Sequence, residues 1–309
     1  MTDEPAQKVL ILGSGPAGLS AALYAARAEL APLVLSGMTL HGQASLTHLI
    51  ENYPGFPDGI GGDALGEAIQ KQAEKFGARM EFDSATKVDL SQRPFKVSTY
   101  GRTYACETLI IATGASPVLL QVPGEKEFTG RGVSYCATCD GYFFREKHVC
   151  VVGGGDSAFE EALFLTRYAA SVTIIHRREG FRASALLQRR AQENPKIHFI
   201  LNSIITEITG DQALKALRLG NVKTGEETEH ATDGLFIFIG HTPNTELFKG
   251  QIDMDERGFI RTGVTMETNI PGVFAAGEAA DPHYRQVATS AGMGVAAAMQ
   301  AIRYLEKLG

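Results

Sequence analysis

The sequence of 309 residues contains few cysteines and no long apolar run. Its four cysteines, Cys106, Cys136, Cys139 and Cys150, are too few and too unevenly spaced for a disulfide framework. No stretch reaches the ~18 apolar residues that are needed to cross a bilayer. Residues 1–8 lack the cationic start and the apolar core of a secretory signal. We therefore expect a cytoplasmic protein that does not enter a membrane.

The sequence also lacks an excess of positive charge. Its net charge is −6, so it provides no broad basic field for a phosphate backbone, and nucleic acid is not an expected partner. Hydrophobic residues make up 44% and charged residues 21%, as in ordinary globular proteins with a packed core. A chain of this length is expected to form two domains.

A strand–turn–helix–strand pattern opens the sequence. Residues 8–12 are apolar and are expected to form a strand, and a glycine-rich turn follows at residues 13–18. Residues 19–28 favour a helix, and residues 32–36 favour a second strand. Together they form a βαβ unit of the size that is typical of mononucleotide binding.

The turn of this unit has the spacing Gly-x-Gly-x-x-Gly at Gly13, Gly15 and Gly18. In such a turn the glycines permit a tight bend and let the backbone approach a pyrophosphate at the positive end of the helix. An ordinary strand-to-helix turn is the alternative. Ser36 and Gly37 stand near the point where an acidic residue usually binds the ribose, so we expect a serine hydroxyl or a backbone amide to bind it instead.

A second pattern of the same kind begins about 140 residues later. An apolar run at residues 148–152 leads into a glycine-rich turn at residues 153–158. A helix is expected over residues 159–168, and a strand over residues 171–175. Two such units in one chain predict two dinucleotide sites.

Basic residues follow the last strand of the second unit. Its turn contains Gly153, Gly155 and Ala158, with a small residue at the last position that permits close helix packing. A His-Arg-Arg run at residues 176–178, with Arg182 beyond it, stands where an acid would bind a free 2′-hydroxyl. Clustered guanidinium groups at this point indicate a 2′-phosphate, and so NADP rather than NAD. A solvated basic surface is the alternative.

Later motifs indicate that the first domain resumes after the second unit. Strand-then-glycine patterns occur at residues 108–115 and 272–277, and a final helix is expected over residues 289–307. We therefore predict an α/β fold of two Rossmann-like dinucleotide-binding domains, the second inserted into the first. The first domain would contain residues 1–117 and 244–309, and the inserted domain residues 118–243.

The chain is expected to cross between the domains near residues 116–120 and 241–245. Pro117 and Pro243 fit such junctions. A two-stranded connection of this kind would act as a hinge.

Cys136 and Cys139 are separated by two residues and followed by Asp140. This spacing lets the sulfurs close a small disulfide, and such motifs commonly contain one thiol of lowered pKa. Half of a zinc site is the alternative, but the sequence has no second closely spaced Cys or His pair, and His148 and Cys150 stand at strand spacing. Asp140 is expected to exchange a proton with the dithiol or to cap a turn.

Taken together, these motifs resemble the low-molecular-weight thioredoxin reductases, almost from end to end. The most specific one is Cys-Ala-Thr-Cys-Asp-Gly at residues 136–141, just ahead of the second nucleotide turn. The resemblance implies FAD in the first domain, NADPH and the dithiol in the inserted domain, a homodimer, and thioredoxin or a thioredoxin-like protein as the partner. Other shared stretches are residues 13–18, 51–55, 112–115, 176–178, 181–183 and 284–286.

The resemblance also implies roles for individual residues. Cys139 would face the flavin, Cys136 would attack thioredoxin, and Asp140 would be the acid. The residues predicted to bind FAD are Gly13, Ser14, Gly15, Pro16, Ala17, Gly18, Ser36, Gly37, Gly42, Gln43, Asn52, Thr113, Gly114, Gly277, Glu278, Asp281, Arg285, Gln286 and Val287. Those predicted to bind NADPH are Gly153, Gly155, Asp156, Ser157, Ala158, His176, Arg177, Arg178 and Arg182. No metal ligand is predicted.

Two positions depart from the pattern of that family, and both concern the seating of FAD. The family usually has Gly-Gly-Gln where this chain has His41-Gly42-Gln43, so a side chain is expected to intrude into a loop that skirts the flavin. An exposed His41 without consequence is the alternative. The family also has aspartate where this chain has Glu278. The extra methylene would shift a carboxylate near the sugar-alcohol chain of the flavin.

We expect an enzyme in which the nicotinamide and the dithiol both lie in the inserted domain and both need contact with the flavin ring. Hydride transfer needs the nicotinamide against the flavin, and dithiol reduction needs a sulfur there, so the two take turns by rotation at the hinge. The helix after Arg285 and Gln286 is expected to direct its positive end toward the flavin. The alternatives are an enzyme reduced by ferredoxin or flavin, an oxidase that closes small dithiols with oxygen, and a noncatalytic redox sensor.

Overall fold

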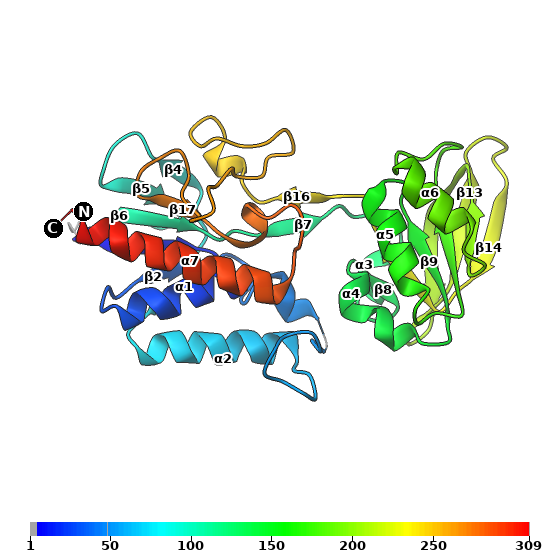
Figure 1. Cartoon of the computed structure of the whole chain (residues 1–309), viewed down its shortest axis with the longest axis horizontal. Helices are drawn as coiled ribbons and strands as arrows, with labels where there is room; N and C mark the ends of the chain where they lie inside the picture. Colours follow the sequence, from blue (N-terminus) through cyan, green and yellow to red (C-terminus); the bar gives the residue numbers. More distant parts are fainter. Residues whose placement is uncertain (1–4, 48, 309) are drawn as a thin grey trace. The chain divides into compact units, whose positions relative to one another are not determined.

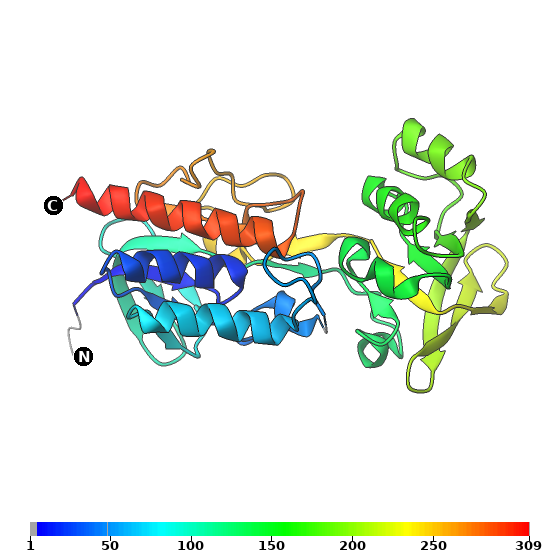
Figure 2. The same cartoon turned by 60° about the horizontal axis from the view of Figure 1, so that its bottom comes forward.

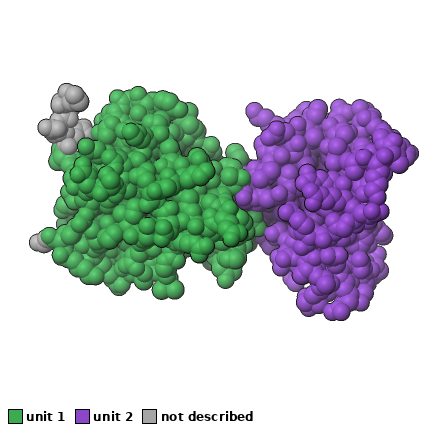
Figure 3. All heavy atoms as spheres, turned by 90° about the horizontal axis from the view of Figure 1, so that it is seen from above, with its two compact units in different colours: residues 1–116, 242–309 green, residues 117–241 purple. Residues whose placement is uncertain are grey.

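The computed structural model describes residues 5–47 and 49–308, and the chain divides into two compact units, coloured separately in Figure 3. Unit 1 contains residues 1–116 and 242–309, and unit 2 contains residues 117–241. The chain passes between them as β7 (Ala115–Pro117) and β16 (His241–Pro243), which pair as a two-stranded ribbon (Figure 1). In chain order, unit 2 is therefore an insertion into unit 1.

Unit 1 is built on a seven-stranded sheet of order β3-β2-β1-β6-β5-β4, with β17 also paired to β6. The pairs β1–β2, β2–β3, β1–β6 and β6–β17 are parallel, whereas β4, β5 and the start of β6 form an antiparallel meander. The strands are β1 (Gln7–Leu12), β2 (Leu33–Leu35), β3 (Arg79–Glu81), β4 (Lys87–Asp89), β5 (Phe95–Ser98), β6 (Thr103–Ile111) and β17 (Val273–Ala275).

Three helices of unit 1 run side by side in Figure 2: α1 (Pro16–Arg27), α2 (Gly62–Lys75) and α7 (Val287–Glu306). Helices α1 and α7 pack on the sheet, and α2 packs against α1. Buried alanines such as Ala21, Ala25 and Ala298 form much of this layer, and their small size lets the helices approach closely. A second apolar cluster, which includes Phe95 and Phe248, covers the other face of the sheet.

Unit 2 combines a parallel sheet with a smaller antiparallel one. The parallel sheet has the order β11-β10-β9-β15-β8, and the antiparallel sheet has the order β12-β13-β14. One apolar cluster packs α5 and α6 on the parallel sheet, and another fills the space between the two sheets. The elements are β8 (Val133–Ser134), β9 (His148–Val152), α5 (Asp156–Leu165), β10 (Ser171–Ile175), α6 (Ala185–Gln192), β11 (Ile197–Ile200), β12 (Ser203–Gly210), β13 (Leu214–Asn221), β14 (Glu227–Ala231) and β15 (Gly234–Ile237).

Short helical segments connect these elements. They are η1 (Gln43–Leu46), α3 (Glu125–Phe128), α4 (Ala137–Asp140), η2 (Gly141–Phe144), η3 (Glu246–Phe248) and η4 (Gly277–Ala279). Within residues 5–47 and 49–308, no helix is both long enough and apolar enough to cross a membrane.

The predicted α/β class with one Rossmann-like unit inserted into another is confirmed, with changes at the ends of elements. Helices α1 and α5 begin three residues earlier than expected, at Pro16 and Asp156, because the glycine turns lead straight into the first helical turn. The strand of the strand-then-glycine pattern at residues 108–115 is the second half of β6, which begins earlier than expected, at Thr103. The first half of β6 pairs with β5 in the antiparallel meander. The apolar pattern at residues 108–115 did not predict this pairing.

Candidate active site

The first dinucleotide turn joins β1 to α1 and has no room for a side chain at two of its glycines. Gly13 has φ +106°, and a Cβ on it would lie 2.2 Å from Ala112 O. A Cβ on Gly18 would lie 1.9 Å from Gly13 O. At Gly15, no described atom beyond its chain neighbours lies within 4 Å of such a Cβ. The backbone therefore packs tightly against other protein atoms at Gly13 and Gly18. It leaves open space at Gly15, the N-cap of α1, where a pyrophosphate would bind.

Ser14 joins this turn to the segment after β2. Its buried hydroxyl donates to Ser36 O at 3.0 Å and accepts from the His41 N–H at 3.1 Å. Ser36 itself is buried, and its hydroxyl donates to Gly37 O at 2.9 Å. Ser36, which is predicted to bind the ribose in place of the usual acidic residue, thus already donates its hydroxyl hydrogen bond to Gly37 O. A bound ribose would compete with Gly37 O for this hydroxyl.

Thr113 lies beside the first turn and carries an unsatisfied polar atom. Its Oγ1 is buried and has no hydrogen-bond partner among the described residues. The next residue, Gly114, has φ +67°, and a Cβ there would meet no described atom within 4 Å apart from its chain neighbours. A buried hydroxyl without a partner, next to open space, fits a bound group with hydrogen-bonding atoms such as FAD.

The C-terminal segment of unit 1 reaches the same turn. A Cβ on Gly277 would lie 2.9 Å from Ala17 Cβ, and one on Gly294 would lie 2.0 Å from Ala17 O. Gly294 lies in α7 and was not predicted to belong to this site, although the small residues around it in the sequence allow close packing. The structure therefore brings residues from the two ends of the chain together at α1.

Asp281 organises the turn that precedes α7. Its Oδ1 accepts hydrogen bonds from the N–H groups of His283 at 2.9 Å and Tyr284 at 3.0 Å, and its Oδ2 accepts one from the N–H of Arg285 at 3.0 Å. Arg285 adopts a left-handed backbone conformation, with φ +50°. Both oxygens of the carboxylate predicted to contact FAD thus have backbone partners.

Two further predicted FAD residues meet across the unit. Asn52 Nδ2 donates to Gln286 Oε1 at 3.1 Å, although 234 residues separate them. Gln286 is the N-cap of α7 and forms a capping box with Thr289. Gln43, at the start of η1, is exposed.

Glu278 is largely withdrawn from water in η4. Burial raises the pKa of its carboxyl, Arg285 opposes this shift, and the nearby charge of Asp281 adds to it. Glu278, which stands where the family pattern has aspartate, is therefore an acid with a raised pKa near the turn before α7.

The second dinucleotide turn, between β9 and α5, repeats the geometry of the first. A Cβ on Gly153 would lie 2.5 Å from Phe238 O, whereas one on Gly155 would meet no described atom within 4 Å outside its chain neighbours. Asp156, which is exposed, accepts a hydrogen bond from the Ser184 N–H at 2.6 Å. The third position of the turn tolerates Ala158, which is buried.

The basic residues after β10 divide into one buried and three exposed side chains. His176 is buried, with its ring 5.3 Å from that of Phe181, whereas Arg177, Arg178 and Arg182 are exposed. Burial lowers the pKa of His176, and the charges of Arg177 and Arg178 add to this effect, whereas backbone hydrogen bonds with Gly180 and Gly153 oppose it. Its Nε2 is buried and has no hydrogen-bond partner in the described part of the chain. This ring, with an unsatisfied nitrogen beside exposed guanidinium groups, fits a bound dinucleotide.

Cys136 and Cys139 form a disulfide at the start of α4, and both are half-buried. Cys136 is the N-cap of this short helix, and its Sγ accepts a hydrogen bond from the Cys139 N–H at 3.2 Å. Thr138 Oγ1 lies 3.4 Å from the same sulfur. Hydrogen-bond donors at this sulfur would stabilise a thiolate on Cys136 after reduction.

Asp140 lies beside the disulfide and is bound by a buried serine. Ser134 Oγ donates to Asp140 Oδ2 at 2.6 Å. Burial raises the pKa of Asp140, and the Ser134 hydrogen bond partly offsets this rise. The carboxyl therefore stays protonated to a higher pH than an ordinary aspartate, as an acid near thiolates requires.

The other two cysteines are not part of this site. Cys106 lies in β6 of unit 1 and Cys150 in β9 of unit 2, and both are buried and free. Burial raises the pKa of each thiol to about 12, so neither forms a thiolate at neutral pH.

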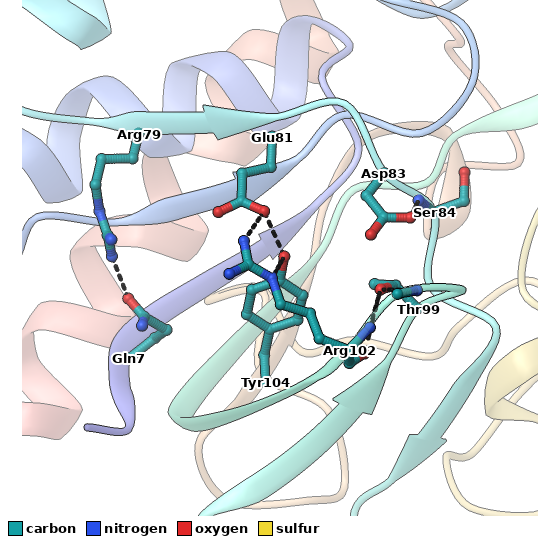
Figure 4. A network of polar contacts seen from close by, with 9 residues as sticks. Gln7, Arg79, Glu81, Asp83, Ser84, Thr99, Arg102 and Tyr104 are labelled. Carbon is teal, nitrogen blue, oxygen red and sulfur yellow. Dashed lines mark hydrogen bonds and ion pairs between the residues drawn. The ribbon is translucent and has the colours of Figure 1, made fainter. Parts of the chain in front are cut away.

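A polar network in unit 1 joins β6 to the edge strand β3 and was not predicted from the sequence (Figure 4). Arg102 and Tyr104 both donate to Glu81 Oε2, and Arg102 Nε donates to Tyr104 OH at 2.6 Å. Burial acts to raise the pKa of Glu81, but these hydrogen bonds outweigh it and lower the pKa. Burial and the Glu81 carboxylate raise the pKa of Tyr104 to about 12. Because Ser36 N–H donates to Glu81 O at 2.9 Å, the network supports the strand end that carries the predicted ribose residue.

One chain thus contains two nucleotide-type turns and a half-buried disulfide beside a half-buried acid, which together define a nucleotide-dependent disulfide oxidoreductase. Residues 7–294 match the family described as pyridine nucleotide-disulphide oxidoreductase. A thioredoxin reductase of Streptomyces coelicolor is 48% identical over 98% of this chain and 95% of its own length. The chain belongs to the low-molecular-weight thioredoxin reductases of this family.

Two solved structures of the family have similar sequence identity to this chain but different TM-scores. The thioredoxin reductase of Streptococcus pyogenes is 43% identical and has a TM-score of 0.93, covering 98% of this chain and 99% of that one. The thioredoxin reductase of Lactococcus lactis in its FR conformation is 42% identical but has a TM-score of 0.67, with 97% and 99% covered. At nearly equal identity, sequence divergence does not account for this difference in TM-score.

Proposed function

We propose that this flavin-type disulfide oxidoreductase passes electrons from NADPH through FAD to the Cys136–Cys139 disulfide, and from there to the disulfide of thioredoxin or a thioredoxin-like protein. The observation that carries the proposal is the disulfide beside the half-buried Asp140, in the same unit as a dinucleotide turn that is followed by exposed arginines. FAD, when bound, would accept a hydride from the nicotinamide and return two electrons to the disulfide.

We assign FAD to unit 1, at the turn between β1 and α1. The open space at Gly15 and the unpartnered Oγ1 of Thr113 support this assignment. The remaining predicted ligands are the residues around Ser36, Gly42, Asn52 and 277–287. Helix α7 begins at Val287, and its N-terminus would stabilise negative charge on a reduced flavin.

We assign NADPH to unit 2, at the turn between β9 and α5. The open space at Gly155 would take the pyrophosphate. Arg177, Arg178 and Arg182 would bind the 2′-phosphate, because guanidinium groups form paired hydrogen bonds with phosphate oxygens. His176 would contribute through its unpartnered Nε2 rather than through charge.

Thiol–disulfide exchange by this site requires two attacks and two protons. In the first, the Cys136 thiolate attacks one sulfur of the partner disulfide, forms a mixed disulfide and displaces a partner thiolate. In the second, the Cys139 thiolate attacks Cys136 Sγ, which closes the Cys136–Cys139 bond again and displaces the second partner thiolate. Asp140, with its raised pKa, would supply a proton for this exchange.

We infer that the enzyme acts in the cytoplasm as a homodimer, with no nucleic-acid or membrane partner. The net charge of −6 supports the absence of a nucleic-acid partner, and the homodimer follows from the family resemblance.

An anaerobic titration tests the electron path. NADPH is expected to bleach the visible absorbance of the flavin, and steady-state turnover with thioredoxin is expected to be much faster with NADPH than with NADH. The Cys139→Ser variant serves as the matched control, because its flavin should still be bleached while turnover with thioredoxin is lost. A flavin that NADPH does not bleach, or oxygen consumption with small dithiols in place of NADPH turnover, would contradict the proposed donor and product.

A further inference from the structure

His41 stands where the family resemblance predicts glycine, and in the structure it is a buried contact between the first dinucleotide turn and α2. Only 4% of its surface is exposed, although Met38 and Leu40 just before it are exposed. The alternative expectation of an exposed loop residue is therefore wrong. The backbone at His41 is left-handed, with φ +61°, a conformation that a side chain adopts only when its contacts compensate the strain.

The imidazole of His41 is held by one face of α2. Its Nδ1 lies 2.8 Å from Asp63 Oδ1, and its Nε2 lies 2.9 Å from Gln70 Oε1. Gln70 Nε2 in turn donates to Glu74 Oε1 at 2.7 Å. Positions 63, 66, 70 and 74 follow the three- and four-residue spacing that places side chains on one helix face.

Gly66, at the centre of this face, makes room for the ring. A Cβ on Gly66 would lie 2.4 Å from His41 Cβ and 2.4 Å from His41 Cγ. The imidazole and a side chain at position 66 therefore cannot occupy this space together. Glycine inside a helix lowers stability by ~0.5–1 kcal/mol relative to alanine. In α2 this loss is accepted at Gly66 because only glycine leaves space for the His41 ring.

The backbone of the same residue contacts the first dinucleotide turn. His41 N–H donates to Ser14 Oγ at 3.1 Å, and a Cβ on Gly42 would lie 3.0 Å from Gly15 Cα. Residues 39–46, which contain His41, Gly42 and Gln43, thus lie against the turn at the point that is open to a pyrophosphate. The ring of His41 fixes one side of this loop to α2 while its backbone fixes the other to Ser14.

We propose that His41 is a positioning residue for FAD, which orders residues 39–46 before the cofactor binds. The inference rests on the proposed FAD site of unit 1. A loop that is already in its binding conformation loses less conformational entropy on binding, so FAD affinity increases. A glycine at this position would remove the side-chain contacts with Asp63 and Gln70 and leave the close packing of Ala44 O on Gly62 to join the loop to α2.

A double-mutant cycle tests the proposal, starting from the purified flavoprotein. The variants are His41→Gly, Gly66→Ala and the combination of the two, and FAD retention is measured by the fluorescence of flavin released on dilution. Each single variant is expected to raise the dissociation constant of FAD about tenfold, through loss of the two ring hydrogen bonds. The double variant is expected to be no weaker than His41→Gly alone, because the Cβ at position 66 then meets no imidazole.

Two further variants separate positioning from general destabilisation. Gly101→Ala adds a Cβ to an exposed glycine of unit 1 that meets no described atom within 4 Å beyond its chain neighbours, and it is expected to retain FAD as the parent does. His41→Asn tolerates the left-handed backbone and keeps a polar side chain, so an intermediate affinity is expected. Additive effects of the two single substitutions, or unchanged FAD affinity in His41→Gly, would overturn the role of His41. A parent protein without bound flavin would instead overturn the proposed FAD site.

Discussion

At the residue scale, one hydroxyl determines how the acid beside the disulfide is held. Ser134 Oγ lies 2.6 Å from Asp140 Oδ2 and 3.2 Å from Cys136 O, and it accepts a hydrogen bond from the Cys136 N–H at 3.1 Å. A serine has a single hydroxyl proton, so it can donate to the carboxylate or to the carbonyl, but not fully to both. When Asp140 is ionised, the Ser134 hydroxyl donates its hydrogen bond to the carboxylate. When Asp140 is protonated, the hydroxyl can donate to Cys136 O instead.

The first prediction concerns this hydroxyl. Ser134→Ala removes a donor that favours the carboxylate, so the pKa of Asp140, already raised by burial, is expected to rise further. The loss of activity that accompanies Asp140 deprotonation should then move to higher pH. The measurement is the pH profile of single-turnover oxidation of the reduced dithiol by thioredoxin. Ser134→Thr keeps the hydroxyl and should restore the original profile, whereas an unchanged profile in Ser134→Ala would exclude Ser134 from the acid's environment.

The raised pKa of Asp140 also predicts how the free energy of unfolding changes with pH. A raised folded-state pKa means that the folded protein binds the proton more tightly than the unfolded chain does. The free energy of unfolding therefore falls as the pH rises from the ordinary aspartate range through the raised pKa of Asp140. Asp140→Asn cannot ionise, so it should lack this part of the decrease. Denaturant titrations of the oxidised protein across this pH range, compared with those of Asp140→Asn, measure the difference.

Residue-scale chemistry was predictable where it depended on local spacing. Cys136, Cys139 and Asp140 are adjacent in the sequence, so their chemistry could be inferred without the fold. The buried state of His41 could not, because its partners Asp63 and Gln70 lie in a helix more than twenty residues away. Likewise, the arginines near His176 suggested a basic cluster, but burial of the His176 ring follows only from the packing of Phe181.

At the scale of elements, the two strand–turn–helix units have the same construction with one difference. Gly15 and Gly155 are the N-caps of α1 and α5, with ψ of 178° and 179°. Their φ values of −69° and −101° are accessible to any residue. The third position differs, because a Cβ on Gly18 would lie 1.9 Å from Gly13 O, whereas the second unit contains alanine there.

This geometry predicts that alanine at Gly15 or Gly155 affects the cofactor and not the fold. Neither Cβ meets a described atom beyond its chain neighbours, so the melting temperature without the corresponding cofactor should be unchanged. Gly15→Ala should weaken FAD and leave the affinity for NADP⁺ intact, and Gly155→Ala should do the reverse. Gly18→Ala is the contrasting variant, since its clash with Gly13 O should lower the melting temperature itself. Equal loss of both cofactors in either N-cap variant would argue against separate sites.

Element order could be predicted because apolar runs and glycine turns repeat in the sequence. The elements that were missed have other origins. Helix α2 has few buried residues, and its role depends on contacts with α1 and the loop at His41. The β12–β13–β14 sheet consists of strands with one exposed face, whose partners are set by the packing of unit 2 rather than by a local motif.

At the scale of the whole molecule, each unit contains its own apolar cores. Two clusters belong to unit 1 and two to unit 2, and the chain connects the units through β7 and β16. A ribbon of two short strands is the kind of connection that the predicted hinge would need.

Separate cores predict that each cofactor stabilises only its own unit. A ligand at 100 times its dissociation constant adds ~2.7 kcal/mol to the stability of the part that binds it. Saturating NADP⁺ should therefore slow amide exchange about 100-fold for those amides of β9 and β10 that exchange only when unit 2 unfolds. Amides of β1 and β6, in the core of unit 1, should exchange at an unchanged rate. Hydrogen exchange with mass spectrometry measures both sets in one experiment, with Gly155→Ala and NAD⁺ as controls. Protection of β1 by NADP⁺ would show that the units unfold as one, because a ligand of unit 2 could slow exchange in unit 1 only through shared stability.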